Sequence, residues 1–210
     1  FGHGHSQKTN TGGEQSKHGI WHEQLDQCIE LARRNDLKVA GLHLHIGSGT
    51  DFEHLSRVCG AMEELAPRVG DTLHSISAGG GLPIRYTEGD QEIDIEYFRL
   101  WDDSRKRIEK TLGRKIDLEI EPGRFVVAES GYLICRICAI KQMGDNLFYL
   151  LDAGFNTLAR PILYGAYHPI SITPVDGSTA DRAEHDVAAG GPLCEGGDIF
   201  TQSEGGCAQK

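Results

Sequence analysis

Residues 116–124 read Ile-Asp-Leu-Glu-Ile-Glu-Pro-Gly-Arg, an alternation of apolar and acidic residues that ends abruptly at a proline. Successive side chains of a strand point to opposite faces, so the pattern predicts a strand with its acidic side chains on one face. Pro122 keeps the preceding residue extended, Gly123 lets a ligand approach the backbone, and Arg124 adds a cationic fork. We therefore expect the segment from Glu121 to Arg124 to bind an anion or a zwitterion, in preference to forming a plain strand-to-loop turn.

The sequence upstream repeats the order of strand, glycine-rich loop and helix. Residues 39–46 predict a strand that ends in Gly47-Ser48-Gly49, and residues 73–78 predict a strand that runs into Gly79-Gly80-Gly81. Apolar residues recur at helical spacing in three segments, residues 21–34, 50–66 and 97–112. Thr50-x-x-Glu53 has the pattern of a capping box at the start of the second helix. Repeated units of this kind indicate an α/β fold with parallel strands, and the polar strand ends fit part of a (β/α)₈ TIM-type barrel.

The pattern changes after the strand at 116–121. Residues 125–140 and 146–151 are rich in β-forming residues with no helix between them, and residues 171–189 read as a loop. We expect residues 1–127 to be the C-terminal part of the barrel. Residues 128–210 are then part of a β-rich C-terminal domain.

Charge and hydrophobicity argue against nucleic acids and membranes as partners. The net charge of −10 argues against nucleic-acid binding, because there is no basic stripe to engage phosphates. No apolar run is long enough to span a bilayer, so we expect no membrane association. Cys135-x-x-Cys138 lies in an apolar run without a second pair at zinc spacing, and we interpret it as structural. Unpaired thiols favour a cytoplasmic protein.

Several polar side chains would face the interior of the predicted barrel. His43 and His45 share a strand face, and burying them or the acids of residues 116–121 without partners would be costly, so we expect a polar site. The N–H groups of Gly79-Gly80-Gly81, together with Ser48, form a candidate phosphate-binding loop. The histidine pair also fits the metal site of a barrel hydrolase. The later strand ends supply glycines and glutamate instead of further ligands, and we expect no metal.

Six short motifs follow one another between Ser16 and Asp198. They are His43-Leu44-His45-Ile46-Gly47-Ser48, Gly79-Gly80-Gly81-Leu82, Glu121-Pro122-Gly123-Arg124, Asp152-Ala153-Gly154-Phe155-Asn156, Arg160-Pro161-x-x-Tyr164 and Gly191-Pro192-Leu193-Cys194-Glu195-x-x-Asp198. In this order they resemble the diaminopimelate decarboxylases, pyridoxal phosphate enzymes of the alanine racemase-like barrel class. The resemblance covers almost the whole chain. It implies that the full-length protein converts meso-2,6-diaminopimelate to L-lysine and CO₂, as a homodimer with shared active sites.

The resemblance also implies residue roles around the cofactor, pyridoxal 5'-phosphate. His45 would stack on the cofactor ring, and Glu121 would pair with the pyridine nitrogen and keep it protonated. A protonated ring is the better electron sink when CO₂ departs. The residues that would hold or border the phosphate are Ser48, Gly79, Gly80, Gly81, Pro122, Gly123 and Arg124.

Further roles concern the substrate. Arg124, Arg160 and Tyr164 would bind its distal carboxylate, and Glu195 would bind its distal ammonium group. Cys194 would return a proton to the reacting carbon, in the active site of the partner subunit. Ornithine-type members of the class resemble this pattern but carry aspartate after the cysteine, so Glu195 favours diaminopimelate.

Two other functions stay open. One is decarboxylation of another basic amino acid, of the ornithine, arginine or carboxynorspermidine type, and the other is a non-catalytic homologue of the barrel. Gly196 stands where the family carries serine. The lysine that holds the cofactor covalently belongs upstream of Phe1, and a late substrate tyrosine belongs beyond Lys210. We therefore expect a fragment lacking both ends, inactive by itself.

Overall fold

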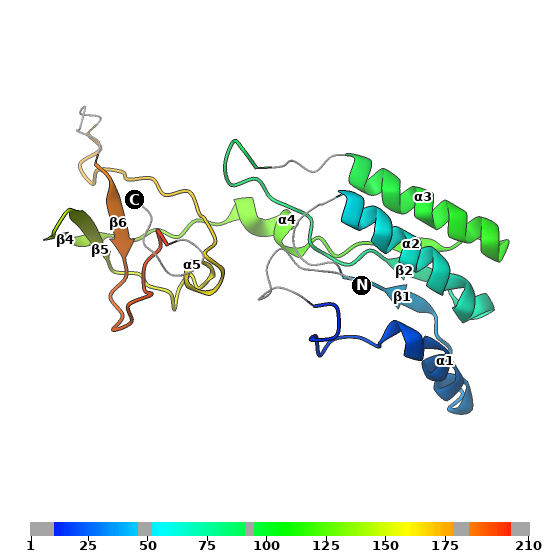
Figure 1. Cartoon of the computed structure of the whole chain (residues 1–210). Coiled ribbons are helices and arrows are strands. Elements are labelled where there is room, and N and C mark those ends of the chain that lie inside the picture. Colours follow the sequence, from blue (N-terminus) through cyan, green and yellow to red (C-terminus); the bar gives the residue numbers. More distant parts are fainter. Residues whose placement is uncertain (1–10, 46–51, 91–94, 179–184, 203–210) are drawn as a thin grey trace. The chain divides into compact units, whose positions relative to one another are not determined.

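The computed structural model describes residues 11–45, 52–90, 95–178 and 185–202. It divides into two compact units, which are drawn in Figure 1 and are described separately below. The first unit contains Phe1–Arg85 and Gly89–Ser130, and the second contains Tyr86–Glu88 and Gly131–Lys210.

Strands and helices alternate in the first unit. Its elements are the 3₁₀ helix η2 (His22–Gln24), α1 (Leu25–Arg34), β1 (Gly41–His43), α2 (Phe52–Val69), η3 (Gly70–Thr72), β2 (Ser75–Ser77), α3 (Ile95–Leu112), β3 (Asp117–Glu119), α4 (Gly123–Val127) and η4 (Ala128–Ser130). The three strands are parallel and lie in chain order, with His43 opposite Ser77 and Ser77 opposite Glu119. Chain-order parallel strands joined by helices are the arrangement of a (β/α)₈ barrel.

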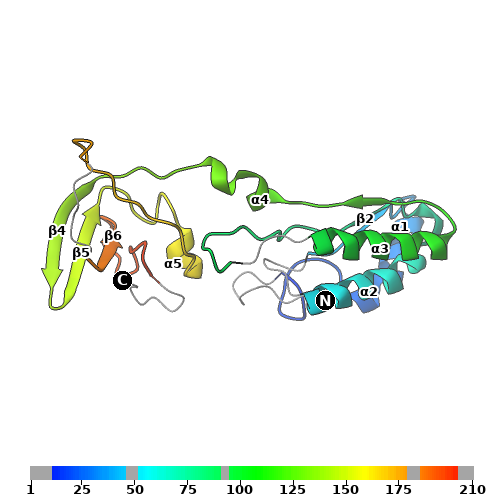
Figure 2. The same cartoon turned by 90° about the horizontal axis from the view of Figure 1, so that it is seen from above.

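The core of this unit lies between the sheet and the two long helices. Figures 1 and 2 both show α2 and α3 side by side. The apolar stripe expected on α2 is confirmed, because Leu55, Val58, Cys59, Met62, Leu65 and Ala66 are all buried. Burial raises the pKa of the Cys59 thiol to about 12, so Cys59 behaves as a small apolar residue. None of the described helices is both long and apolar enough to cross a membrane.

The predicted strand–helix order is confirmed, with smaller differences in detail. Each strand is shorter than its sequence pattern suggested, at three residues. The alternation before Pro122 holds only in part: Ile116 is buried, Leu118 is half-buried and the three acids on the other face are exposed, but Ile120 is 38% exposed as well. Phe98, expected on the apolar stripe of α3, is 39% exposed instead. Thr50 of the predicted capping box lies outside the described residues.

The second unit is built on a small mixed sheet. Strands β4 (Ile137–Met143) and β5 (Asn146–Leu151) form the antiparallel hairpin visible in Figure 2. Gly144 supplies the positive φ of 58° in the turn between them, which most other residues adopt only with strain. Strand β6 (Val187–Gly190) pairs with β5 in parallel, and the short helix α5 (Arg160–Tyr164) lies between β5 and β6 in the sequence.

Three expectations for this half of the chain were wrong. Residues 123–130 form α4 and η4 although Phe125, Val126 and Val127 favour strands, because context overrides propensity over such short segments. Helix α5 was missed, although Pro161 in its first turn and left-handed Gly165 at its end are typical helix boundaries. The end of the expected loop 171–189 joins β6, in which Val187 is followed by small residues with weak strand preference.

The two cysteines of the Cys-x-x-Cys motif lie at the surface. Both Cys135 and Cys138 are exposed free thiols, and Cys135 precedes β4. Their structural role stays a prediction.

Candidate active site

A carboxylate lies where the three parallel strands of the first unit end. His43 from β1 places its Nε2 3.1 Å from Oε1 of Glu121, just beyond β3. Ser77 at the end of β2 donates its hydroxyl to the same oxygen at 3.2 Å. The other oxygen, Oε2, has no hydrogen-bond partner among the residues that the structure describes. The carboxylate is therefore held on one side and can accept from a ligand on the other.

The glycine loop packs closely between the neighbouring strand ends. Gly79 has φ +66°, and a Cβ there would lie 2.5 Å from the carbonyl oxygen of Leu44. A Cβ on Gly80 would lie 2.7 Å from the carbonyl oxygen of Glu121. Only glycine fits both positions, which brings this backbone against His45 and Glu121.

Two N–H groups of this loop already donate within the protein. Gly80 donates to Nδ1 of His45 at 3.0 Å, and Gly79 donates to the hydroxyl of Ser77 at 3.2 Å. Because Nδ1 is an acceptor, the neutral His45 ring carries its proton on Nε2. The loop thus orients the imidazole and the serine. The phosphate-binding role expected of Gly79, Gly80 and Gly81 stays a prediction, and Ser48 lies outside the described residues.

Arg124 follows the Glu121 carboxylate by three residues in the sequence. Gly123 donates its N–H to the carbonyl of Glu121 at 2.8 Å, which closes a tight turn after Pro122. The turn leads into α4, whose first residues are Gly123 and Arg124. Within the described part of the chain, the Arg124 guanidinium forms no hydrogen bond or ion pair. Its five N–H donors are available to an anion.

We expect Gly79→Ala to destabilise the packing of the glycine loop between the neighbouring strand ends. The positive φ and the backbone contact together cost about 2–5 kcal/mol of folding free energy in an L-residue. A lower unfolding midpoint of the full-length protein in urea is the measurement. Gly60→Ala is the matched control, because Gly60 lies in α2 and a Cβ there would meet no other atom within 4 Å. It should stabilise the helix by about 0.5–1 kcal/mol, and equal midpoints for the two variants would contradict the close packing at Gly79.

The remaining predicted residues belong to the second unit. Arg160 and Tyr164 are the first and last residues of α5, four apart and hence on one face. Cys194 and Glu195 are exposed in the loop before Asp198. A Cβ on Gly197 would lie 2.9 Å from Cδ1 of Ile162, so this loop packs on α5.

Sequence patterns provided no indication of two residues that surround Arg160. Its Nη1 lies 3.3 Å from the hydroxyl of Tyr86 and 3.1 Å from Nε2 of His168. The guanidinium carbon also lies 5.8 Å from the centre of the Tyr86 ring, within cation–π range. Tyr86 and His168 come from segments with no recognisable motif, so only the folded structure could identify them.

The structure thus brings the predicted residues together in two groups. The barrel group is His45, Gly79, Gly80, Gly81, Glu121, Pro122, Gly123 and Arg124, in the first unit. The sheet group is Arg160, Tyr164, Cys194 and Glu195, in the second unit. Among the described residues, no cluster of three or more His, Cys, Asp or Glu side chains is arranged to hold a metal ion.

The barrel group fits pyridoxal phosphate in chemical type. It offers an imidazole ring oriented by Gly80, and, within the described ranges, a carboxylate oxygen without a protein donor and an unpaired guanidinium. The imidazole suits stacking on the aromatic ring of the cofactor. The carboxylate oxygen suits its protonated ring nitrogen, and the guanidinium suits its phosphate.

Comparisons of the sequence and of the structure with known proteins both find similarity to pyridoxal-dependent decarboxylases. Residues 1–128 match the pyridoxal-binding domain of the pyridoxal-dependent decarboxylases, and residues 124–205 match their C-terminal sheet domain. A diaminopimelate decarboxylase from Buchnera aphidicola is 56% identical over 100% of this chain and 50% of its own length. A crystal structure of a diaminopimelate decarboxylase, 51% identical, superposes with a TM-score of 0.92 and covers 100% of this chain and 50% of that one.

A second crystal structure, of the Helicobacter pylori diaminopimelate decarboxylase complexed with L-lysine, is 29% identical with a TM-score of 0.71. It covers 92% of this chain and 47% of that chain. The chain therefore spans about half the length of the relatives it matches.

The fold expected from the sequence is confirmed as part of a (β/α)₈ barrel followed by part of a β-rich domain. The expected cofactor, pyridoxal phosphate, is confirmed by the same matches. This chain belongs to the pyridoxal-dependent decarboxylase family.

Proposed function

We propose that the full-length protein decarboxylates meso-2,6-diaminopimelate at its D-configured carbon and releases L-lysine and CO₂. Residues 1–127 contribute to the cofactor-binding barrel and residues 128–210 to the sheet domain. The observation that carries the proposal is the Glu121 carboxylate, held on one oxygen by Ser77 and His43 beside a glycine loop and His45. The 56% identical Buchnera relative is a diaminopimelate decarboxylase, which supports the choice of reaction.

The barrel group holds the cofactor. When bound, pyridoxal phosphate supplies an electron-withdrawing ring that stabilises the charge left on the substrate carbon as CO₂ departs. Glu121 keeps the ring nitrogen protonated, because its negative charge favours the cationic form. His45 would stack on the ring, and Gly80 orients its imidazole through the hydrogen bond to Nδ1. The close-approach glycines and Arg124 border the phosphate.

The sheet group recognises the far end of the substrate. Arg160, with Arg124 and Tyr164, binds the distal carboxylate, for which a guanidinium fork is well shaped. Tyr86 and His168 restrict the orientation of the Arg160 fork. Glu195 binds the distal ammonium group. A substrate with a carboxylate and an ammonium group at its far end is satisfied by this set, and the lysine bound in the H. pylori enzyme is the product that such a substrate leaves.

Cys194 returns a proton from its Sγ to the carbon that has lost CO₂. Its thiol is exposed in this chain and accepts or donates no hydrogen bond among the described residues, which leaves the proton available for transfer. We place this step in a homodimer, in which Cys194 of one subunit serves the barrel of the other. The protein is cytoplasmic in this proposal, as its free thiols favour.

The test is a measurement of CO₂ release by the full-length gene product loaded with pyridoxal phosphate. Diaminopimelate should exceed ornithine and arginine in kcat/KM by roughly a hundredfold or more, because unpaired polar groups in the site penalise substrates that lack the distal carboxylate. A preference for ornithine or arginine would support the alternative decarboxylase. No CO₂ from any of the three would support the non-catalytic homologue.

Substitution of Glu195 by alanine tests the choice of substrate. Loss of a hydrogen bond between charged groups is worth about 1.5–3 kcal/mol, so kcat/KM for diaminopimelate should fall by roughly 10-fold to 150-fold. Activity on substrates without the distal ammonium group should change little. Glu129→Ala, which removes an exposed acid outside both groups, is the control. An unchanged preference in Glu195→Ala would remove Glu195 from substrate recognition.

A further inference from the structure

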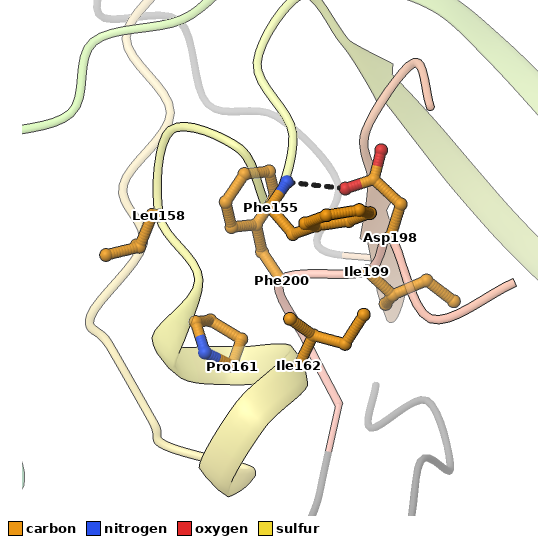
Figure 3. Close-up of a pocket in the computed structure, with 7 residues that line it drawn as sticks. All are labelled: Phe155, Leu158, Pro161, Ile162, Asp198, Ile199 and Phe200. Carbon is orange, nitrogen blue, oxygen red and sulfur yellow. Dashed lines mark hydrogen bonds between the residues drawn. The ribbon is translucent and has the colours of Figure 1, made fainter. Parts of the chain in front are cut away.

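The carboxylate of Asp198 is buried in the second unit, at 4% exposure of the residue. Figure 3 shows it beside Phe155, whose backbone N–H donates to Oδ1 at 2.7 Å. Oδ2 accepts the backbone N–H of Leu193 at 2.8 Å. Each carboxylate oxygen is thus bonded to a different loop, one before α5 and one directly before Cys194.

The backbone of Asp198 closes the second of these loops. Its carbonyl accepts the N–H of Gly191 at 2.8 Å, and its own N–H donates to the carbonyl of Glu195 at 3.0 Å. The segment from Gly191 to Asp198 is therefore tied at its start, its middle and its end. Cys194 and Glu195 lie within that closed segment.

Two glycines leave room for the carboxylate. A Cβ on Gly154 would lie 2.7 Å from Oδ2 of Asp198, and a Cβ on Gly191 would also collide with the carboxylate. Both loops approach Asp198 more closely than any other residue type allows. This fit specifies where the two loops lie relative to each other.

The surroundings strengthen the two hydrogen bonds. Figure 3 shows apolar side chains around the pocket next to Asp198, from Phe155, Leu158, Pro161, Ile162, Ile199 and Phe200. Hydrogen bonds to an ionised acceptor are stronger than neutral ones, and low local polarity strengthens them further. Loss of either bond would leave a buried group unsatisfied.

We infer that Asp198 is a positioning residue for the proposed decarboxylation: it holds the Cys194–Glu195 loop at a fixed distance from the loop that leads into α5 and Arg160. The inference rests on the proposed function. Asp198 does not contact the substrate in this account. It acts through the backbone, by fixing the position in which the Cys194–Glu195 loop presents the proton donor to the active site that it serves in this proposal. Displacement of a reacting group by about 1 Å costs roughly a hundredfold in rate.

The experiment replaces Asp198 by asparagine in the full-length enzyme. The amide NH₂ must then face a backbone N–H, so one of the two bonds is lost while size is preserved. Hydrogen exchange should rise in peptides that contain Phe155 and Leu193, by roughly tenfold or more. The kcat per bound cofactor should fall by roughly 10-fold to 100-fold, and KM should rise as well, because Glu195 lies in the same loop. Because kcat is calculated per mole of bound cofactor, only folded sites are counted. A lower kcat then does not reflect a smaller amount of folded protein.

Asp176→Asn is the matched control. Asp176 is exposed, and its carboxylate also accepts a backbone N–H, that of Ser178 at 3.0 Å, but within its own turn. It should leave both exchange at Leu193 and kcat unchanged. If Asp198→Asn does not fold, Gly154→Ala takes its place, because it keeps the acid and pushes the carboxylate away from the loop.

The outcomes separate the inference from the proposed function. Normal kcat per bound cofactor in the folded variant, with an active wild type, overturns the positioning role. Unchanged exchange at Phe155 and Leu193 overturns the loop attachment itself. A wild-type protein that releases no CO₂ from diaminopimelate overturns the proposed function instead, while the exchange measurement still reports on the attachment.

Discussion

Replacement of Cys194 by alanine is expected to lower the kcat of the full-length enzyme for lysine formation by roughly 10²-fold to 10⁴-fold, the usual contribution of a positioned proton donor. The thiol is the only acidic proton of this side chain, and alanine cannot replace it. Binding of the cofactor and of the substrate should persist, because these tasks fall to other residues. The measurement is kcat and KM for CO₂ release, with cofactor content determined for each preparation.

Cys138→Ala is the matched control for this prediction. Cys138 is another exposed thiol of the second unit, 3.8 Å from the carbonyl oxygen of Arg136, and belongs to neither group of site residues. Full activity in Cys138→Ala and strong loss in Cys194→Ala would assign the proton to Cys194. If Cys194→Ala retained more than about a tenth of the wild-type kcat, another group would have to deliver the proton.

The sequence predicted the long elements before Pro122 better than the short segments after it. Alternation in residues 116–121 and the stripe of α2 depend on periods of 2 and 3.6, which long amphipathic segments carry clearly. Segments such as α4 and α5 have five residues each, too few for a period to emerge. Pro161 and Gly165 marked the boundaries of α5, but boundary residues without a periodic interior do not distinguish a helix from a turn.

The residues of the candidate site also differ in whether the sequence alone could reveal them. Glu121, His45 and Cys194 lie in short motifs that sequence alone could single out. Ser77 and Tyr86 could not be found this way, because each acts through a partner that is more than 40 residues away in the chain. Their hydrogen bonds depend on the register of the parallel strands and on how the loops fold back. Asp198 stood in a recognised motif, yet its contacts with Phe155 and Leu193 follow only from the packing.

Replacement of Glu121 by glutamine is the second change with a large expected effect. The amide keeps the shape and can still accept from Ser77 and His43, but it loses the negative charge that favours a protonated ring nitrogen. We expect kcat to fall by roughly 10²-fold to 10³-fold, as for removal of one preorganised electrostatic contact. The affinity for pyridoxal phosphate should also weaken, by roughly 10-fold to 100-fold, because a hydrogen bond to a charged group becomes a neutral one.

Glu119→Gln is the control for this variant, because Glu119 belongs to β3 on the same exposed face and is two residues from Glu121. Its carboxylate has no hydrogen-bond partner among the described residues, so its loss should leave turnover and cofactor affinity unchanged. Cofactor affinity comes from absorbance titration of the apoenzyme and turnover from CO₂ release. If both variants lowered turnover and cofactor affinity equally, the effect would come from the overall negative charge at this strand end and not from the Glu121 carboxylate in particular. A specific effect of Glu121→Gln on both quantities would tie the carboxylate that Ser77 and His43 hold to the ring nitrogen of the cofactor.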